Sequence, residues 1–224
     1  ISTTAPTKTE SKESPKTEAM KIPAFLNCSL TAKAKTVLYD NLTLKDCAGK
    51  LIVKDQTVTL QNVITSVFGG QIGLNGMVST KEKTPKFNMD LGLNKVDIAQ
   101  TFTQLDMLKK IAPIAGAVSG KLNSTIKLSG NLNANEMTPD LKTISGDLLG
   151  QLLSTTVNSS NSTLLSALDS NIKFIDLKKL NLNDLKAAVS FKDGKVTVKP
   201  FDIKYQDIKA TIGGTHGFDQ AMNY

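Results

Sequence analysis

Residues 87–94 read Phe-Asn-Met-Asp-Leu-Gly-Leu-Asn, and their strict alternation of apolar and polar side chains decides the fold class. Successive side chains of an extended strand point to opposite faces, so this strand has one apolar face and one polar face. Much of the chain repeats the same plan. The sequence therefore predicts a mainly β protein: an extended, twisted antiparallel sheet built from repeated hairpins, with two to four short amphipathic helices packed on or between the sheets.

The positive charge of the chain comes from lysine alone. The sequence has 224 residues and a formal net charge of +7, and none of its 27 basic residues is Arg. Arg reads phosphates and guanine edges with paired hydrogen bonds, so its absence argues against nucleic acid as a partner. The lysines are spread among Asp and Glu, which is typical of a solvated surface and also suits weak attraction to anionic lipid headgroups.

The chain divides into a polar leader and a β-rich body. Residues 1–20 are mainly Thr, Lys, Glu, Ser and Pro, so they bury too little apolar surface to offset their ordering entropy, and we expect a disordered linker. Residues 21–224 form the predicted β-rich segment, with helical apolar spacing near 98–112 and 162–176. No apolar run approaches the ~20 residues that span a bilayer. The sequence starts at Ile1, without an initiator Met or a signal peptide, and we expect a piece of a longer protein whose export signal or membrane anchor lies outside these residues.

An internal repeat relates residues 44–76 to residues 182–214. The dipeptide Lys-Asp at 54–55 recurs at 192–193, and a glycine late in the third strand recurs as well. Apolar character is kept at many of the other matched positions. Alternation alone generates some matches between β segments, but the shared turn favours a true repeat, and repeats of this kind build extended surfaces.

The sequence offers no set of residues for catalysis or metal binding. His216 is the single His, and it falls in an alternating strand near the C-terminus, where an ordinary structural role is expected. The glycines at 70, 73 and 76 resemble a phosphate-binding loop, but apolar residues continue the strand where a helix N-terminus is required. We expect these glycines to allow twist, a bulge or close packing. The prediction is therefore a protein without catalytic residues, metal or cofactor.

The two cysteines, Cys28 and Cys47, leave two alternatives open. In an exported protein they are candidates for a disulfide. Cys47, however, aligns with Leu185 in the internal repeat, which favours a small buried apolar side chain.

At this point the chain resembles the C-terminal region of AsmA-like proteins over about residues 22–224. The order of its short motifs is more distinctive than any one of them. The segments that carry the resemblance are Gly69–Gly76, Thr84–Phe87, Val96–Ala99, Leu108–Pro113, Ser119–Leu122 and Phe191–Phe201.

The resemblance implies a large, non-enzymatic envelope protein of Gram-negative bacteria. Such a protein is anchored in the inner membrane, here by a segment outside these residues, and extends into the periplasm. The family is similar to bridge-like lipid-transfer proteins, whose long β-groove carries phospholipid acyl chains. The implied partner is phospholipid, and the implied function is phospholipid transport between the membranes or outer-membrane biogenesis.

The alternating strands supply a candidate lining for such a groove. A wall of aliphatic side chains with few rings is compatible with sliding acyl chains, whose burial is worth ~25 cal/mol per Å². The alternative is a structural or protein-binding envelope module, in which the same side chains form the core beneath the helices. The candidate lipid-contact residues are Ile72, Leu74, Phe87, Met89, Leu91, Leu93, Leu122, Ile126 and Leu128.

Overall fold

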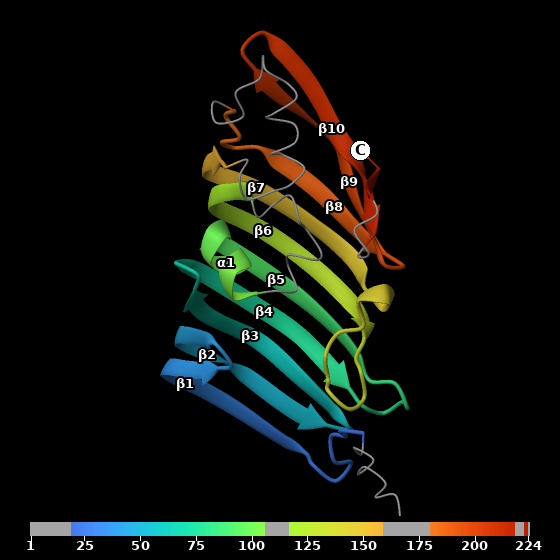
Figure 1. Ribbon diagram of the computed structural model, residues 1–224. Coiled ribbons are helices and arrows are strands. Elements are labelled where there is room, and N and C mark those ends of the chain that lie inside the picture. Colours follow the sequence, from blue (N-terminus) through green and yellow to red (C-terminus); the bar gives the residue numbers. More distant parts are fainter. Residues whose placement is uncertain (1–18, 106–116, 159–179, 218–221, 224) are drawn as a thin grey trace, which may run out of the picture.

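The computed structural model describes residues 19–105, 117–158, 180–217 and 222–223. These residues form one antiparallel sheet in which every strand pairs with its neighbours in the sequence, from β1 at one edge to β11 at the other (Figure 1). The predicted mainly β fold of repeated hairpins is confirmed. The strands are β1 (Cys28–Tyr39), β2 (Leu42–Lys54), β3 (Thr57–Val67), β4 (Gly70–Ser79), β5 (Lys86–Asp97), β6 (Val118–Asn131), β7 (Ser145–Val157), β8 (Lys186–Lys192), β9 (Lys195–Tyr205), β10 (Ile208–Gly217) and β11 (Met222–Asn223).

Tight turns join the strands of the meander. Asp55 and Gln56, between β2 and β3, have φ angles of 50° and 56°. Two successive residues of positive φ are the pattern of a type I′ turn, whose twist matches that of the strands it joins. The turn at 193–194, between β8 and β9, repeats the pattern with φ angles of 51° and 73°. The Lys-Asp dipeptide therefore marks equivalent hairpins in the two regions.

The regions 44–76 and 182–214 also agree in their second and third strands, whereas their first strands differ: β2 covers thirteen residues and β8 covers seven. β3 and β9 both cover eleven residues, and their bounds fall at matched positions of the two regions. The ladder to the following strand shifts register at matched positions too, after Leu60 in β3 and after Val198 in β9. Shared bounds, turns and irregularities are what a structural repeat requires.

Bulges keep the apolar side chains on one face of long strands. Asn62 in β3 and Lys95 in β5 have φ angles of 49° and 52°, and the ladder shifts register beside each of them. An extra residue of this kind reverses the alternation, so the apolar residues on both sides of it face the same way. Asn75 accepts a hydrogen bond from the Asn62 amide at 2.7 Å, and Asn123 accepts one from the Lys95 amide at 2.8 Å.

One face of the sheet, here called the inner face, is covered at both ends of its strands. At one end lies α1 (Ile98–Gln104), in front of the sheet in Figure 1, and Leu105 after it packs against a first buried cluster. This cluster consists of Val67, Phe68 and Val96. At the other end lies the loop 132–144, which includes the short helix η2 (Leu141–Thr143). The loop forms a second buried cluster with the strands, consisting of Phe87, Leu132, Ile144, Phe191 and Val196. The opposite face is called the outer face.

The helix predicted near 98–112 begins where the sequence places it. The side chain of Asp97 caps α1 by accepting the amide of Gln100 at 2.9 Å. The described helix ends at Gln104, and residues 106–112 lie outside the described part of the chain, as does the helix predicted at 162–176. The leader expected to be a linker is likewise described only from residue 19.

Candidate functional site

The inner face carries an unbroken row of aliphatic side chains across seven strands. Each member pairs directly with the next on the neighbouring strand, and directly paired residues of an antiparallel sheet share a face. At ~4.8 Å per strand the row is ~29 Å long. This inner row consists of Val63, Leu74, Leu91, Ile126, Leu148, Val189 and Val198.

The rows on either side of the inner row contain no Lys, Asp or Glu. One neighbouring row runs from Thr65 through Ile72 and Leu93 to Ala187, and the other from Leu60 through Met89 and Leu128 to His216. The lysines that alternate with these residues lie on the outer face. From β3 to β8, charged side chains are thus absent from these three rows of the inner face.

The nine predicted lipid-contact residues all lie on the inner face, but they do not share one environment. Phe87 is only 9% exposed, and it belongs to the buried cluster beneath the loop 132–144. Val96 of the other cluster is 1% exposed, and Ile72 and Leu93 pack against that cluster. Leu74, Leu91 and Ile126 lie between the two clusters, belong to neither of them, and are half-buried.

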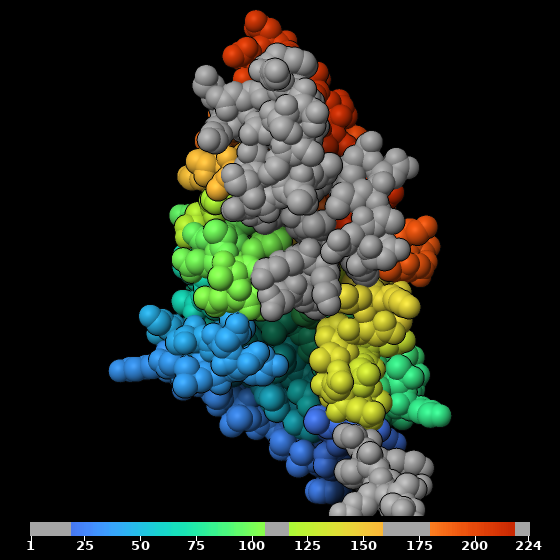
Figure 2. Space-filling view, viewed as in Figure 1, coloured from blue at the N-terminus to red at the C-terminus, as the bar shows by residue number. Residues whose placement is uncertain are grey.

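Figure 2 shows a hollow on this face of the molecule. Its floor has the colours of β3 and β4, and the hairpin of β1 and β2, α1 and the loop 132–144 surround it. Leu60, Val63 and Leu74 are the aliphatic residues that these two strands direct to the inner face at mid-strand. The hollow therefore exposes the inner face over β3 and β4.

The sequence did not identify the part of the inner row that lies on β7. Residues 148–149 and 152–153 are both Leu-Leu, so alternation is lost there, and residues 131–160 as a whole are rich in Asn, Ser and Gly. In the structure Leu148 faces inward beside Ile126, whereas Leu149 faces outward. Gly146 and Gly150, which lie two residues before Leu148 and two residues before Leu152, are the signal that marks the inward set.

Of the two alternatives for Cys28 and Cys47, the disulfide is not formed. Both thiols are free, with Cys28 exposed and Cys47 half-buried. Cys47 pairs across the ladder with Ala34, which is six residues from Cys28 along β1, or ~20 Å at ~3.3 Å per residue. A disulfide needs Cα atoms within about 7 Å. The Cys47 thiol instead lies 3.2 Å from the hydroxyl of Thr65.

The described residues contain no group of three or more His, Cys, Asp or Glu side chains that could hold a metal ion. His216 is buried on the inner side of β10, where it pairs with Val196.

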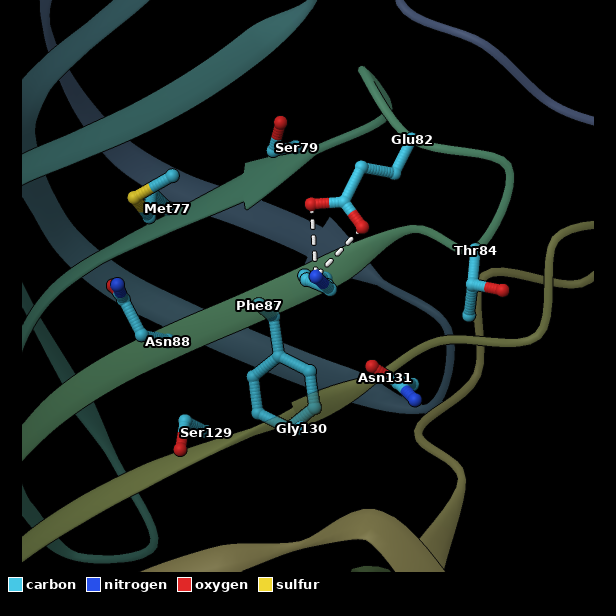
Figure 3. A pocket seen from close by; sticks show the side chains of 10 residues that line it. Met77, Ser79, Glu82, Thr84, Phe87, Asn88, Ser129, Gly130 and Asn131 are labelled. Carbon is cyan, nitrogen blue, oxygen red and sulfur yellow. Dashed lines mark hydrogen bonds and ion pairs between the residues drawn. The ribbon is translucent and has the colours of Figure 1, made fainter.

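Two shallow depressions lie away from the inner row. One, with a volume of about 440 Å³, opens where β4, β5 and β6 end near the β4–β5 turn (Figure 3). Lys86 lies beside it and pairs with Glu82 at 2.7 Å, and Phe87 forms part of its wall with its ring directed toward Gly130.

The second depression lies between β9, β10 and the segment before β8. Asp202 on its wall accepts hydrogen bonds from Lys209 at 2.8 Å and from Thr211 at 2.7 Å. These bonds, that from Lys209 above all, hold the pKa of the Asp202 carboxyl below its ordinary value. Asp184 lines the same depression and accepts a hydrogen bond from the side-chain amide of Gln151. An ionised, exposed carboxylate held by a lysine is suited to solubility and local order rather than to proton transfer.

No family profile, curated protein or solved structure matches this chain. Within the described ranges, none of the helices is long and apolar enough to cross a membrane.

Proposed function

We propose that this chain is a non-enzymatic, AsmA-like segment that holds phospholipid acyl chains against its inner face. In this proposal it belongs to an envelope protein anchored in the inner membrane, and it acts in the periplasm in phospholipid transport or outer-membrane biogenesis. The observation that carries the proposal is the inner row, an uncharged aliphatic surface that continues without a break from β3 to β9.

The dimensions of the inner row suit an acyl chain. The hydrocarbon core of a bilayer is ~30 Å thick, so one acyl chain occupies about half of that length. The row, at ~29 Å, is long enough for a chain laid along it. Each methylene removed from water contributes up to ~0.8 kcal/mol, and contact on one side only gives a fraction of that value. A chain is therefore retained by many weak contacts and remains free to slide.

The polar headgroup stays in water in this arrangement. The inner row and its neighbours offer no charged partner, whereas lysines line the outer face and the turns. Diffuse positive charge of this kind attracts anionic headgroups without fixing them. The proposed site is consequently unselective for headgroup chemistry, apart from a preference for negative charge.

The two buried clusters favour a second candidate, a structural or protein-binding module. α1 and the loop 132–144 already cover both ends of the inner face. If the middle is also filled by the protein itself, no acyl chain binds, and partners dock elsewhere.

A pair of identical substitutions on opposite faces separates the two candidates. Leu91→Asp places a carboxylate on the inner row, and Leu149→Asp places one on the outer face two strands away. The probe is cis-parinaric acid, a fluorescent fatty acid, and transfer is followed with fluorescent phosphatidylethanolamine moving between phosphatidylethanolamine/phosphatidylglycerol vesicles. Because an ion in an apolar contact costs several kcal/mol, Leu91→Asp should weaken binding at least about tenfold and Leu149→Asp should not.

Circular dichroism and the thermal midpoint establish that each variant is folded. The near-isosteric Leu91→Asn replaces Leu91→Asp if the latter does not fold. A wild-type chain that neither binds the fatty acid nor transfers the lipid, or a folded Leu91→Asp protein that binds as tightly as wild type, overturns the proposal in favour of the structural module.

A further inference from the structure

The outer face carries a second uncharged row, which the proposed lipid site does not use. Its large members are unusually exposed for the middle of a sheet: Ile64 is 43% exposed and Leu149 is 61% exposed. Between them, Gly73 and Gly92 pair directly, and a Cβ on either glycine would meet no atom within 4 Å. This outer row consists of Ile64, Gly73, Gly92, Thr125, Leu149 and Ala188, one from each of the strands β3 to β8.

The sizes of the side chains along the outer row, read from β3 to β8, are complementary to the sizes of the same row read from β8 to β3. Read from β3 the row is large, small, small, medium, large, small; read from β8 it is small, large, medium, small, small, large. When one reading is laid on the other, Leu149 falls on Gly73, Ile64 falls on Ala188 and Thr125 falls on Gly92. Every projecting side chain meets a small residue.

We propose that two copies of this chain pack outer face to outer face about a two-fold axis that runs along the strands between β5 and β6. Such an interface is isologous, so each contact occurs twice. Leu149 of each copy enters the open space above Gly73 of the other. Two sheets packed in this way lie ~10 Å apart, which is the separation that interdigitated side chains fill.

The charges beside the outer row agree with the same axis. The row of paired residues on one side consists of Asn75, Asp90, Lys127 and Asp147. In the dimer, Asp90 lies opposite Lys127 of the second copy, and Asn75 lies opposite Asp147.

On the other side of the outer row the facing groups are amides. Gln71 comes to lie opposite Gln151, and Asn94 opposite Asn123. Neither flanking row brings like charges together between β4 and β7. The outer face is thus complementary, in side-chain size and in charge, to the same face turned around the two-fold axis. For this reason we assign it to a second copy rather than to another protein.

The contact is small, and its strength follows from its size. Six strands at ~4.8 Å and three rows at ~7 Å cover about 600 Å² on each copy. Stable complexes bury about 800 Å² on each partner. We therefore expect a reversible dimer with a dissociation constant in the micromolar range.

Sedimentation velocity from about 0.5 to about 500 µM tests the proposal, since that range extends below and above a micromolar dissociation constant. Wild type should pass from monomer to dimer. Gly73→Leu fills the space that Leu149 requires, so it should raise the dissociation constant at least about tenfold while the thermal midpoint of the dilute protein stays the same or rises. Leu149→Asp should also break the dimer. The matched control is Leu38→Asp, because Leu38 is 76% exposed on the edge strand β1 and lies outside the contact.

Two further variants fix the geometry. Asp90→Lys should weaken the dimer by facing Lys127, and the double exchange Asp90→Lys with Lys127→Asp should restore it. In a background with Cys28→Ser and Cys47→Ser, a short bis-maleimide reagent should join Gly73→Cys of one copy to Leu149→Cys of the other, because sheets ~10 Å apart are too distant for a direct disulfide. Either cysteine alone should not give a covalent dimer, because the same cysteine of the second copy lies three strands away across the interface.

The overturning results are equally specific. A wild-type chain that stays monomeric throughout the concentration range disproves the proposal. So does a dimer that Gly73→Leu and Leu149→Asp leave intact, or one that a single cysteine cross-links as readily as the pair.

Discussion

Two glycines three residues apart on β4 should respond in opposite directions to the same added methyl group. Gly73 faces outward, and a Cβ there would meet no atom within 4 Å. Gly76 faces inward, and a Cβ there would lie 2.7 Å from the carbonyl oxygen of Asn88 and 3.1 Å from the Cβ of Met89. Neither glycine has a φ in the left-handed region, so Ala suits the backbone at both positions.

The magnitudes follow from those distances. Replacing Gly by Ala restricts the unfolded chain and stabilises a compatible site by about 0.4–1 kcal/mol, so Gly73→Ala should raise the free energy of unfolding by about 0.7 kcal/mol. Gly76→Ala restricts the unfolded chain in the same way, but its methyl group pushes β5 away from β4. Overpacking of this kind costs about 1–3 kcal/mol. The net loss at Gly76 should be about 1–2 kcal/mol, and the two variants should differ by about 2–3 kcal/mol.

Urea unfolding followed by far-ultraviolet circular dichroism measures the difference, since the chain has no Trp to report by fluorescence. With an m value of about 2.5 kcal/mol/M, the two midpoints should lie about 1 M apart on opposite sides of wild type. The measurement belongs at low protein concentration, where the proposed dimer is dissociated. Midpoints that move in the same direction, or a Gly76→Ala midpoint equal to that of wild type, would refute the assignment of the two glycines to an open face and a crowded face.

Three other predictions concern packing, bulges and charge. Ile144→Ala removes the 2%-exposed side chain that anchors the loop 132–144, so urea unfolding should show a loss of about 3 kcal/mol. Asn123→Ala should lower stability by about 1 kcal/mol and speed hydrogen exchange of the Lys95 amide, because that amide loses its acceptor. Lys209→Ala should raise the pKa of Asp202 toward its ordinary value in a carboxyl NMR titration. Because the pKa of Asp202 is lowered, its bond to Lys209 stabilises the folded protein at pH values above the unfolded-state pKa. This stabilisation is lost as the pH falls through the folded-state pKa, so the stabilities of the variant and wild type should differ least in acid.

The bulges show how a sequence signal becomes readable only through the structure. In the first repeated region, the Asn62 amide donates to Asn75 across the ladder. In the second region, Pro200 stands at the position of Asn62 and has no amide hydrogen to donate. Gly213 stands at the position of Asn75, where a Cβ would meet the Pro200 ring at 3.0–3.1 Å. The two differences compensate each other, yet in the sequence they look like unrelated mismatches.

The fold class could be predicted because it depends on local physics. Alternation at residues 87–94 requires a two-faced strand whatever its neighbours are, and a Lys-Asp turn restricts the backbone over only a few residues. The start of α1 was likewise set by the short-range bond from Asp97 to the Gln100 amide. β7 was missed because its Leu pairs place apolar side chains on both faces, so period two is lost.

The surfaces were decided by tertiary structure alone. That Cys28 and Cys47 cannot meet, that Leu74, Leu91 and Ile126 stand side by side, and that Leu149 lies in line with Gly73 all depend on cross-strand register. Register joins residues that are tens of positions apart, and a shift by one residue would exchange the two faces. The sequence by itself determined that each strand has an apolar and a polar side. The register of the strands determined that the apolar sides align into a continuous inner row, and that the outer face carries the row proposed to bind a second copy.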